Sequence, residues 1–207
     1  MNLIAIGCSF RNTPVEVRER LALTDAKVEL ALGELGRRFG CEAVILNTCN
    51  RVELYLAHPT ESPPGEGPIS DFLGELHAAP ADLIRGHLYS HADAEAVRHL
   101  FRVTASLDSM IVGEGQIAKQ VREAYERSLQ KKATGATLNA LFPQAIRAAK
   151  RARTETGIAL GHVSVSSVAV DYVRQVFDHF GDKTVLVIGA GKMGRLTLKH
   201  LRELQPK

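Results

Sequence analysis

Three short aliphatic runs near the start of the chain place the strongest limit on its fold. They span residues 2–7, 42–47 and 51–56, and each has the length and composition of a β-strand. Between the first two runs, apolar residues recur at helical spacing after Thr24, which is a suitable N-cap. The order strand, helix, strand, strand therefore predicts an α+β fold, in which helices cover a small βαββ-type sandwich.

A proline- and glycine-rich stretch at residues 59–68 separates this region from a mainly helical one. Its four prolines and two glycines cannot continue a helix or a central strand, so we expect a surface loop. Beyond it, apolar spacing predicts helices over residues 69–78, 93–105, 116–130, 138–154 and 165–180. Pro143 lies inside the fourth of these helices, which is therefore expected to begin or kink there.

The segment from Lys183 to Gly194 predicts the start of a second domain. A buried strand over residues 183–188 leads into a glycine-rich turn and a helix over residues 193–204, which is the order of a dinucleotide-binding fingerprint. The expected cofactor-binding residues are Gly189, Ala190, Gly191, Lys192, Met193 and Gly194. Thirteen residues follow, and a lone parallel strand lacks hydrogen-bonding neighbours, so we expect a fragment of a longer protein or one that has lost this domain.

Composition narrows the functional class. With 45% hydrophobic and 24% charged residues, the chain is neither disordered nor fibrous. No apolar run approaches the roughly 20 residues of a membrane span, and no signal-peptide pattern is present, so we expect a cytoplasmic protein with no membrane partner. The net charge of +3 permits an anionic partner without requiring one. Three cysteines without paired spacing predict free thiols and no metal site.

Cys49 is the strongest candidate for chemistry. It lies in the turn 47–51 between two predicted strands, where side chains are displayed rather than buried. A free thiol has a pKa of about 8.5, so a cysteine nucleophile needs a nearby cation to become ionised at neutral pH. Alternate residues of an extended chain point the same way, which would place Arg51 beside the sulfur. A small core cysteine is the alternative interpretation, and it fits Cys8 and Cys41 better.

Five segments spread along the chain carry a family resemblance. They are V-E-V-R-E-R at residues 15–20, T-C-N-R-V-E-L-Y at 48–55, L-D-S-M-I-V-G-E-G-Q-I at 107–117, K-R-A-R-T-E-T at 150–156 and V-S-V-S-S at 163–167. In this order they resemble the glutamyl-tRNA reductases, which catalyse the first committed step of the C5 route to tetrapyrroles. The resemblance covers essentially the whole chain and is far more specific than the glycine fingerprint.

The resemblance implies a domain organisation. It places a catalytic, substrate-binding domain at residues 1–155, a helical linker that begins the family's spinal helix at 156–180, and the incomplete start of a Rossmann-type NADPH domain at 181–207. The family's dimerisation domain would follow, so a full-length member is expected to be a homodimer. Glutamyl-tRNA(Glu) is the implied substrate, NADPH the implied cofactor, and glutamate-1-semialdehyde aminomutase a candidate partner.

The resemblance also implies a mechanism. A family cysteine attacks the ester carbon of glutamyl-tRNA, and hydride from NADPH then reduces the thioester to glutamate-1-semialdehyde. Cys49 matches that nucleophile, and His99 matches a nearby histidine that would assist thiol deprotonation or protonate the departing ribose oxygen. Arg51 is the expected clamp for the substrate carboxylate, and Glu114 suits its ammonium group. The other expected substrate-binding residues are Thr48, Asn50, Ser109, Gly115, Gln116 and Gln120.

The residues alone also allow interpretations in which they have no catalytic or binding role. His99 also fits an exposed helical histidine, and the segment 114–120 also fits an ordinary helix start. Two positions depart from the family pattern. Phe10 stands where a histidine is usual, and Gly115 replaces a proline, which loosens the turn because proline fixes φ. Neither departure touches Cys49.

Residues 130–155 form the most basic stretch of the chain. It contains one acidic residue, Glu155, and six basic residues, which are Lys131, Lys132, Arg147, Lys150, Arg151 and Arg153. The stretch fits either a groove for the tRNA backbone or a solvated helix face. Two further functional alternatives remain. The chain forms the thioester and loses it to water as a slow esterase, or it is a non-catalytic module that binds tRNA or a partner while Cys49 is idle.

Overall fold

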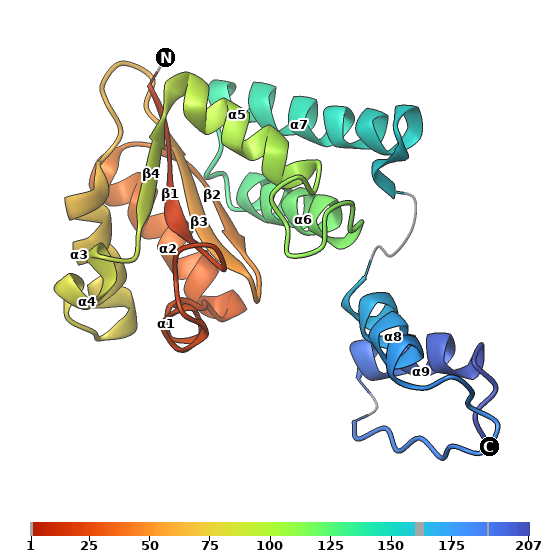
Figure 1. Cartoon of the computed structure of the whole chain (residues 1–207). Helices are drawn as coiled ribbons and strands as arrows, with labels where there is room; N and C mark the ends of the chain where they lie inside the picture. Colours follow the sequence, from red (N-terminus) through yellow and green to blue (C-terminus); the bar gives the residue numbers. More distant parts are fainter. Residues whose placement is uncertain (1, 160–163, 190) are drawn as a thin grey trace.

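The computed structural model describes residues 2–159, 164–189 and 191–207. Within them, a four-stranded antiparallel sheet lies between two layers of helices (Figure 1). The strands are β1 (Leu3–Ser9), β2 (Glu42–Asn47), β3 (Arg51–Ala57) and β4 (Tyr89–Ala92), in the spatial order β2-β3-β1-β4. The predicted α+β class is confirmed, and β4 is an edge strand that the sequence analysis did not predict.

One face of the sheet packs against the first helical layer. Its helices are α1 (Val15–Leu21), α2 (Asp25–Phe39), α3 (Glu66–His77) and α4 (Ala81–Arg85). The Thr24 hydroxyl caps α2 by accepting the Lys27 N–H at 3.3 Å, and Gly40 ends the helix in a left-handed conformation with φ of 61°. The predicted N-cap and one of the two predicted stops are therefore confirmed, while α1 and α4 are additions.

The other face packs against α5 (Asp93–Thr104), α6 (Gln116–Gln130) and α7 (Ala136–Glu155). The strand residue Glu42 caps α7, because its carboxylate accepts the N–H groups of Thr137 at 3.0 Å and Leu138 at 2.8 Å. The helix starts well before Pro143 and continues through it. The predicted bounds of α6 agree with the structure, and those of α3, α5 and α7 agree to within three residues.

Alternation along β3 decides which side chains meet each helical layer. Val52, Leu54 and Leu56 belong to the core beneath α2 and α3. Their neighbours Arg51, Glu53 and Tyr55 point the opposite way, because successive strand residues face opposite sides of a sheet. A strand covered on both faces is usually apolar throughout. Here, instead, an arginine and a glutamate are buried beneath α5, with exposed fractions of 2% and 0%.

The C-terminal part departs from the sequence prediction. A 3-10 helix (Gly157–Ala159) precedes α8 (Val165–Val176), which packs against α9 (Lys192–Arg202) (Figure 1). The predicted buried strand over residues 183–188 is wrong, since this segment forms no strand and Leu186 and Ile188 are 82% and 91% exposed. The reason is physical: a parallel strand needs neighbouring strands, and none of the strands in the described residues pairs with this segment.

Other outcomes in this part are smaller. Helix α8 ends at Val176 rather than at residue 180. Helix α9 agrees with the helix predicted over residues 193–204 to within two residues at each end. Ala190 lies outside the described residues. The domain bounds at residues 156 and 181 stay predictions. Across the described chain, no helix has both the length and the apolar character that crossing a membrane requires.

Gly7 in β1 supplies a test of the sheet. A Cβ at this position would lie 2.2 Å from the Val52 carbonyl oxygen, so Gly7→Ala should lower the free energy of unfolding by about 1–3 kcal/mol. Gly33→Ala on the open face of α2 is the control, because nothing lies near its Cβ and alanine favours the helix by roughly 0.5–1 kcal/mol. In urea, the unfolding midpoint should fall for Gly7→Ala and rise for Gly33→Ala relative to the wild-type chain. A Gly7→Ala variant as stable as the wild-type chain would contradict this packing.

Candidate active site

Hydrogen bonds hold the backbone of the turn between β2 and β3, which carries Cys49. The Thr48 hydroxyl oxygen accepts the N–H groups of Asn50 and Arg51, both at 3.1 Å. From α1, Arg18 Nη1 donates to the Cys49 carbonyl oxygen at 2.7 Å. The backbone of the turn is thus held from both sides, while the Cys49 side chain remains exposed. Cys8 and Cys41 are buried, as expected for core cysteines.

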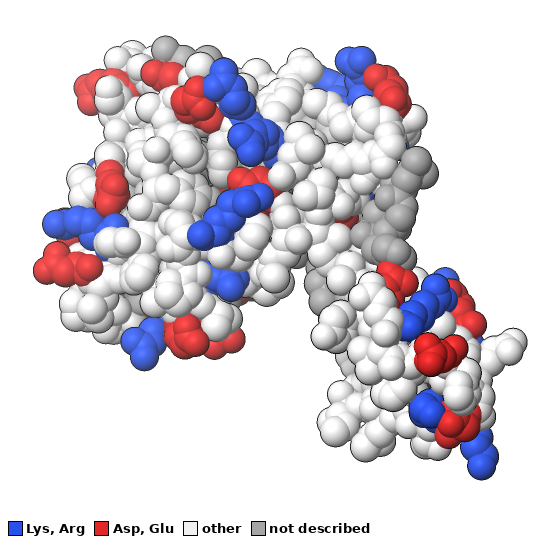
Figure 2. Space-filling view, viewed as in Figure 1, with Lys and Arg blue, Asp and Glu red and all other residues white. Residues whose placement is uncertain are grey.

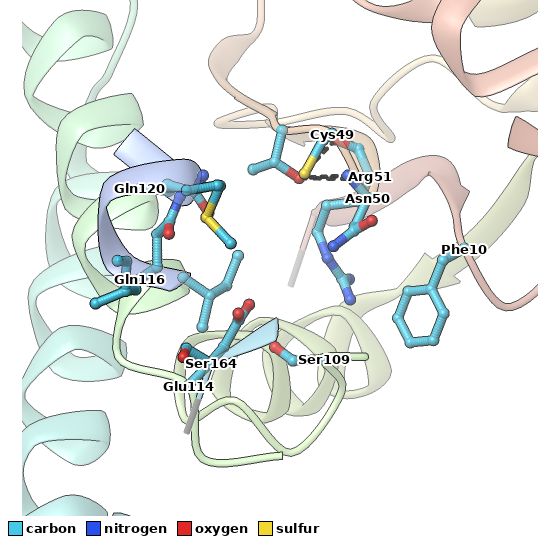
Figure 3. A pocket seen from close by; sticks show the side chains of 13 residues that line it. Phe10, Cys49, Asn50, Arg51, Ser109, Glu114, Gln116, Gln120 and Ser164 are labelled. Carbon is cyan, nitrogen blue, oxygen red and sulfur yellow. Dashed lines mark hydrogen bonds between the residues drawn. The ribbon is translucent and has the colours of Figure 1, made fainter. Parts of the chain in front are cut away.

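Cys49 lines a cavity of about 220 Å³, which Figure 3 shows from close by. The cavity brings together most of the predicted substrate-binding residues: Thr48, Asn50, Arg51, Ser109, Glu114, Gln116 and Gln120. Gly115 does not line it. A Cβ there would lie 3.4 Å from the Arg153 guanidinium carbon, so this glycine faces α7. A proline at this position would have to fit against that guanidinium.

The cavity also has walls that the sequence analysis did not predict. Ile117 follows Gln116 on α6, and Ser164 and Leu196 come from the C-terminal part. Phe10, noted only as a departure from the family pattern, supplies an aromatic wall, and its N–H donates to the Asn50 carbonyl oxygen at 2.8 Å. Among these residues, Ile117 could have been predicted from the sequence, because the helical spacing of α6 places it near Gln116 and Gln120.

A buried ion pair fixes the cation of this cavity. Arg51 Nη1 donates to Glu53 Oε1 at 2.5 Å, and Arg51 Nη2 donates to the Asp108 carbonyl oxygen. Glu53 also accepts hydrogen bonds from the hydroxyl groups of Tyr55, at 2.6 Å, and Tyr89. Both charges are therefore paired and hydrogen-bonded, which a buried pair requires.

The same contacts set the protonation of the pair. Burial by itself raises the pKa of Glu53, but the hydrogen bond with His99 and the charge of Arg51 outweigh burial and lower this pKa to about 2. Burial opposes the charge of Arg51 as well, yet Glu53 and the nearby tyrosines raise its pKa above the ordinary value. Glu53 is thus an anion and Arg51 a cation across the physiological range.

His99 contacts the carboxylate of this ion pair. Its Nε2 is 3.0 Å from Glu53 Oε1, and its ring centroid is 4.7 Å from that of His91. It lines a separate cavity with Arg11, His91 and Asp108, among others, and it is absent from the lining of the Cys49 cavity. The structure therefore connects His99 to Arg51 through Glu53 rather than placing it against the thiol.

Glu114 supplies the acidic group of the Cys49 cavity. Burial raises the pKa of its carboxyl above the ordinary value, although a hydrogen bond with Ser109 and the charge of Arg51 act in the opposite direction. Figure 3 shows Glu114 and Ser109 grouped at one side of the cavity, with Cys49 across from them. A cationic ligand group beside Glu114 would favour its ionised form.

Two positions of the glycine-rich segment are suited to glycine. Gly189 has φ of 104°, and a Cβ on Gly194 would lie 2.5 Å from the Gly189 carbonyl oxygen, so both positions favour glycine. Gly191 is the N-cap of α9, whose first N–H groups suit a pyrophosphate. Of the other predicted cofactor-binding residues, Met193 lines the Cys49 cavity. The side chain of Lys192 is outside what the structure describes.

Comparisons with known proteins show the family of the chain. A family model for the glutamyl-tRNA(Glu) reductase N-terminal domain matches residues 6–156, which include every residue of the Arg51 network. The chain belongs to the glutamyl-tRNA reductase family. A second family model, for shikimate and quinate 5-dehydrogenases, matches residues 171–207, where the glycine-rich turn lies. The resemblance drawn from the five sequence segments is thereby confirmed.

Individual relatives cover nearly all of this chain. A glutamyl-tRNA reductase of Geobacter sulfurreducens is 43% identical over 206 residues, and one of Pelotomaculum thermopropionicum is 46% identical over 204 residues. Each match covers 97% of this chain and 46% or 45% of the relative. The structure of the glutamyl-tRNA reductase of Methanopyrus kandleri aligns with a TM-score of 0.69 and 35% identity, covering 98% of this chain and 47% of that one. The chain spans about half the length of the relatives it matches.

The buried carboxylate of Glu53 predicts a pH dependence of stability. Its folded pKa of about 2 lies below the ordinary value of about 4.3, so it stabilises the fold above pH 4 and this contribution is lost as the pH falls toward 2. Glu53→Gln should lower the free energy of unfolding at pH 7 by roughly 3–5 kcal/mol, because Arg51 loses its buried partner. The variant should also lose part of the decline in stability between pH 4.5 and 2.

Two further variants make this test specific. Tyr89→Phe removes one hydrogen bond to Glu53 and should cost about 1.5–3 kcal/mol while keeping the pair. Asp71→Asn breaks only an exposed pair with Arg85 and should change stability by less than about 0.5 kcal/mol. Thermal unfolding across the pH range measures all three, and a Glu53→Gln variant with the wild-type profile would contradict the buried pair.

Proposed function

We propose that this chain provides the thioester-forming half of a glutamyl-tRNA reductase, an NADPH-dependent enzyme of the C5 route to tetrapyrroles. The substrate would be glutamyl-tRNA(Glu), and the product glutamate-1-semialdehyde. The observation that carries the proposal is the exposed Cys49 thiol in one cavity with the buried Arg51 guanidinium and the Glu114 carboxyl. Resemblance to the family supports homodimerisation of the full-length protein and a glutamate-1-semialdehyde aminomutase as the consumer of its product.

The cavity residues suggest how a glutamyl group is bound. Arg51 would hold the side-chain carboxylate with the N–H groups that do not reach Glu53 or Asp108, since a guanidinium has five donors. Glu114 would take the α-ammonium group, with Ser109 as a polar neighbour. The ester carbonyl then lies toward Cys49, on the opposite side of the cavity. Binding at both ends of the glutamyl group would align the carbonyl for attack.

The reaction at Cys49 is an acyl transfer. A bond forms between the sulfur and the ester carbon, the bond between that carbon and the ribose oxygen breaks, and the thiol proton ends on the ribose hydroxyl group. When bound, NADPH supplies a hydride that turns the thioester into the aldehyde and frees the cysteine. Gly189, Gly191 and Gly194 are the residues that would hold its pyrophosphate. His99 would act on the reaction through Glu53 and Arg51.

A slow esterase is the second candidate. It is favoured by the exposure of the Cys49 side chain, which would leave a thioester formed there open to water. A thioester on Cys49 would then react with water and release glutamate without any dependence on NADPH. The third interpretation, a module that only binds tRNA or a partner, requires no adduct on Cys49.

Cys49→Ser should abolish the adduct that the wild-type chain forms with glutamyl-tRNA, because a serine hydroxyl without a dedicated base is a much weaker nucleophile. Acid quenching followed by intact-mass and peptide analysis detects a glutamyl group on residue 49. Cys41→Ser is the control, since that thiol is buried and donates to the Leu35 carbonyl oxygen. An adduct that persists in Cys49→Ser would refute the nucleophile. Glutamate release without NADPH would identify the esterase.

Some of the basic residues of 130–155 are already engaged. Lys131 pairs with Glu29 at 2.7 Å, Arg151 with Glu155 at 3.0 Å, and Arg153 Nη1 donates to the Gly113 carbonyl oxygen at 2.6 Å. On the face that Figure 2 shows, both signs of charge are interspersed. Arg147 and Lys150 are exposed one turn apart on α7 and, within the described chain, no carboxylate pairs with them. We propose these two as contacts to the tRNA backbone.

The double variant Arg147→Glu and Lys150→Glu should weaken binding of glutamyl-tRNA by about tenfold or more. It should also reduce the slope of log K against log salt by about 2, because each phosphate contact releases counterions. A control with the same change in net charge is Arg37→Glu with Arg85→Glu, on helices of the opposite layer. Equal losses in the two double variants would show a general charge effect instead of a contact surface.

A further inference from the structure

A second cavity, of about 180 Å³, adjoins the Cys49 cavity. Gln120 lines both cavities, and the residues beyond it on α6, Glu123, Ala124 and Arg127, line only the second. On the facing wall, Asn47 of the second cavity directly precedes Thr48 of the first. The two cavities are therefore consecutive parts of one groove between α6 and the end of β2.

The order of residues along this groove gives the substrate a direction. In the proposed function, Arg51 and Glu114 hold the glutamyl group and Cys49 meets the ester carbon. The part of the substrate beyond the ester has to continue past Cys49, away from Arg51. Figure 3 shows Gln116 and Gln120 on α6 across the cavity from Cys49. From Gln120 to Arg127 the helix rises about 10 Å, which is the length of a nucleoside.

The lining of the second cavity suits a neutral ligand with hydrogen-bond donors. The carboxylates of Asp25 and Glu123 are 85% and 54% exposed. Asp25 pairs with Arg127 and Glu123 with Lys119 at 3.4 Å, and the lone pairs that these contacts leave open can accept hydrogen bonds from a ligand. Arg127 is the cation among the described residues that line this cavity, and it pairs with Asp25. An anionic ligand would therefore find no unpaired cation in this lining. The base of the cavity is apolar, since Val28 and Ile45 line it and are buried. A phosphate would face two carboxylates, whereas ribose hydroxyl and base amino groups would find acceptors.

Asn47 forms part of the framework of this cavity. Its Nδ2 donates to the Leu23 carbonyl oxygen at 2.6 Å, and its Oδ1 accepts the Leu23 N–H at 3.1 Å. These bonds hold the end of β2 against the segment before α2. The polar groups of the α6 wall are Gln120, Glu123 and Arg127, and Ala124 between them lines the cavity and also packs against the core beneath the helix.

We propose that this second cavity, with Gln120, Glu123 and Ala124 as its α6 wall, is the subsite for the terminal ribonucleoside of the tRNA, the nucleoside whose ribose carries the glutamyl ester. The inference rests on the proposed function and deepens it. It assigns recognition of the leaving group to α6, separately from recognition of the amino acid by Arg51 and Glu114. Filling the cavity should affect substrates that carry the nucleoside and spare those that lack it.

The test compares two acyl donors on the same variants. One donor is glutamyl-tRNA, and the other is the p-nitrophenyl ester of glutamate, which has no nucleoside. Ala124→Phe should slow the formation of the Cys49 adduct from glutamyl-tRNA by tenfold or more and change the rate with the small ester by less than twofold. Glu123→Gln, which keeps the shape of an exposed side chain and breaks its pair with Lys119, should show a several-fold loss with the same selectivity. Ala140→Phe, exposed on α7 and outside both cavities, is the matched control.

A binding measurement separates this inference from the proposed function. Calorimetric titration of the trinucleotide C-C-A should give a weaker affinity for Ala124→Phe than for the wild-type chain and for Ala140→Phe. Equal binding to all three proteins, or equal losses of rate with both acyl donors, would overturn the subsite. If the wild-type chain forms no adduct from either donor, the proposed function fails, and the trinucleotide titration still decides the subsite.

Discussion

The buried pair of Arg51 and Glu53 is the interaction on which the rest of the site depends. Two charges taken out of water are costly unless every donor and acceptor finds a partner. The partners here come from three elements: Tyr55 from β3, Tyr89 from β4 and His99 from α5. The same pair that fixes the guanidinium therefore also ties the edge strand and a covering helix to the middle of the sheet. Loss of the pair would loosen the sheet and the cavity together.

The sequence predicts those elements whose signal lies within the segment itself, and it misses those that depend on pairing with distant segments. Apolar spacing places β2 and α6 correctly because each buries one or two continuous faces. The four residues of β4, Tyr-Ser-His-Ala, have no such pattern, and only pairing with β1 makes them a strand. The segment 183–188 shows the converse, since a strand-like composition forms no strand without neighbours. The cavity residues near Cys49 came from a contiguous motif and its family, whereas Ser164 and Leu196 reach it by tertiary folding alone.

Glu53 shows why the site could be predicted only in part. Alternation in Arg51-Val52-Glu53-Leu54-Tyr55 predicts a strand with a polar and an apolar face, and polar faces usually meet water. Burial of that face beneath α5 depends on contacts that are distant in sequence. The same contacts join His99 to Glu53, so the structure shows it as a partner of the ion pair. Its contribution would then be the orientation of Arg51, a positioning role that proton transfer at Cys49 does not require.

A cation that already has a buried counter-ion changes how a substrate is selected. Glu53 and the Asp108 carbonyl hold Arg51 in place without any ligand, so a carboxylate ligand would meet a preformed guanidinium group and would require little reorganisation. The thiol, by contrast, is exposed on a turn whose backbone alone is fixed. The cavity thus has two different environments, a buried end with a paired cation and an accessible end with the thiol. Met193 and Leu196 border that cavity directly after the glycine-rich turn, so a hydride donor seated there would approach from the accessible end.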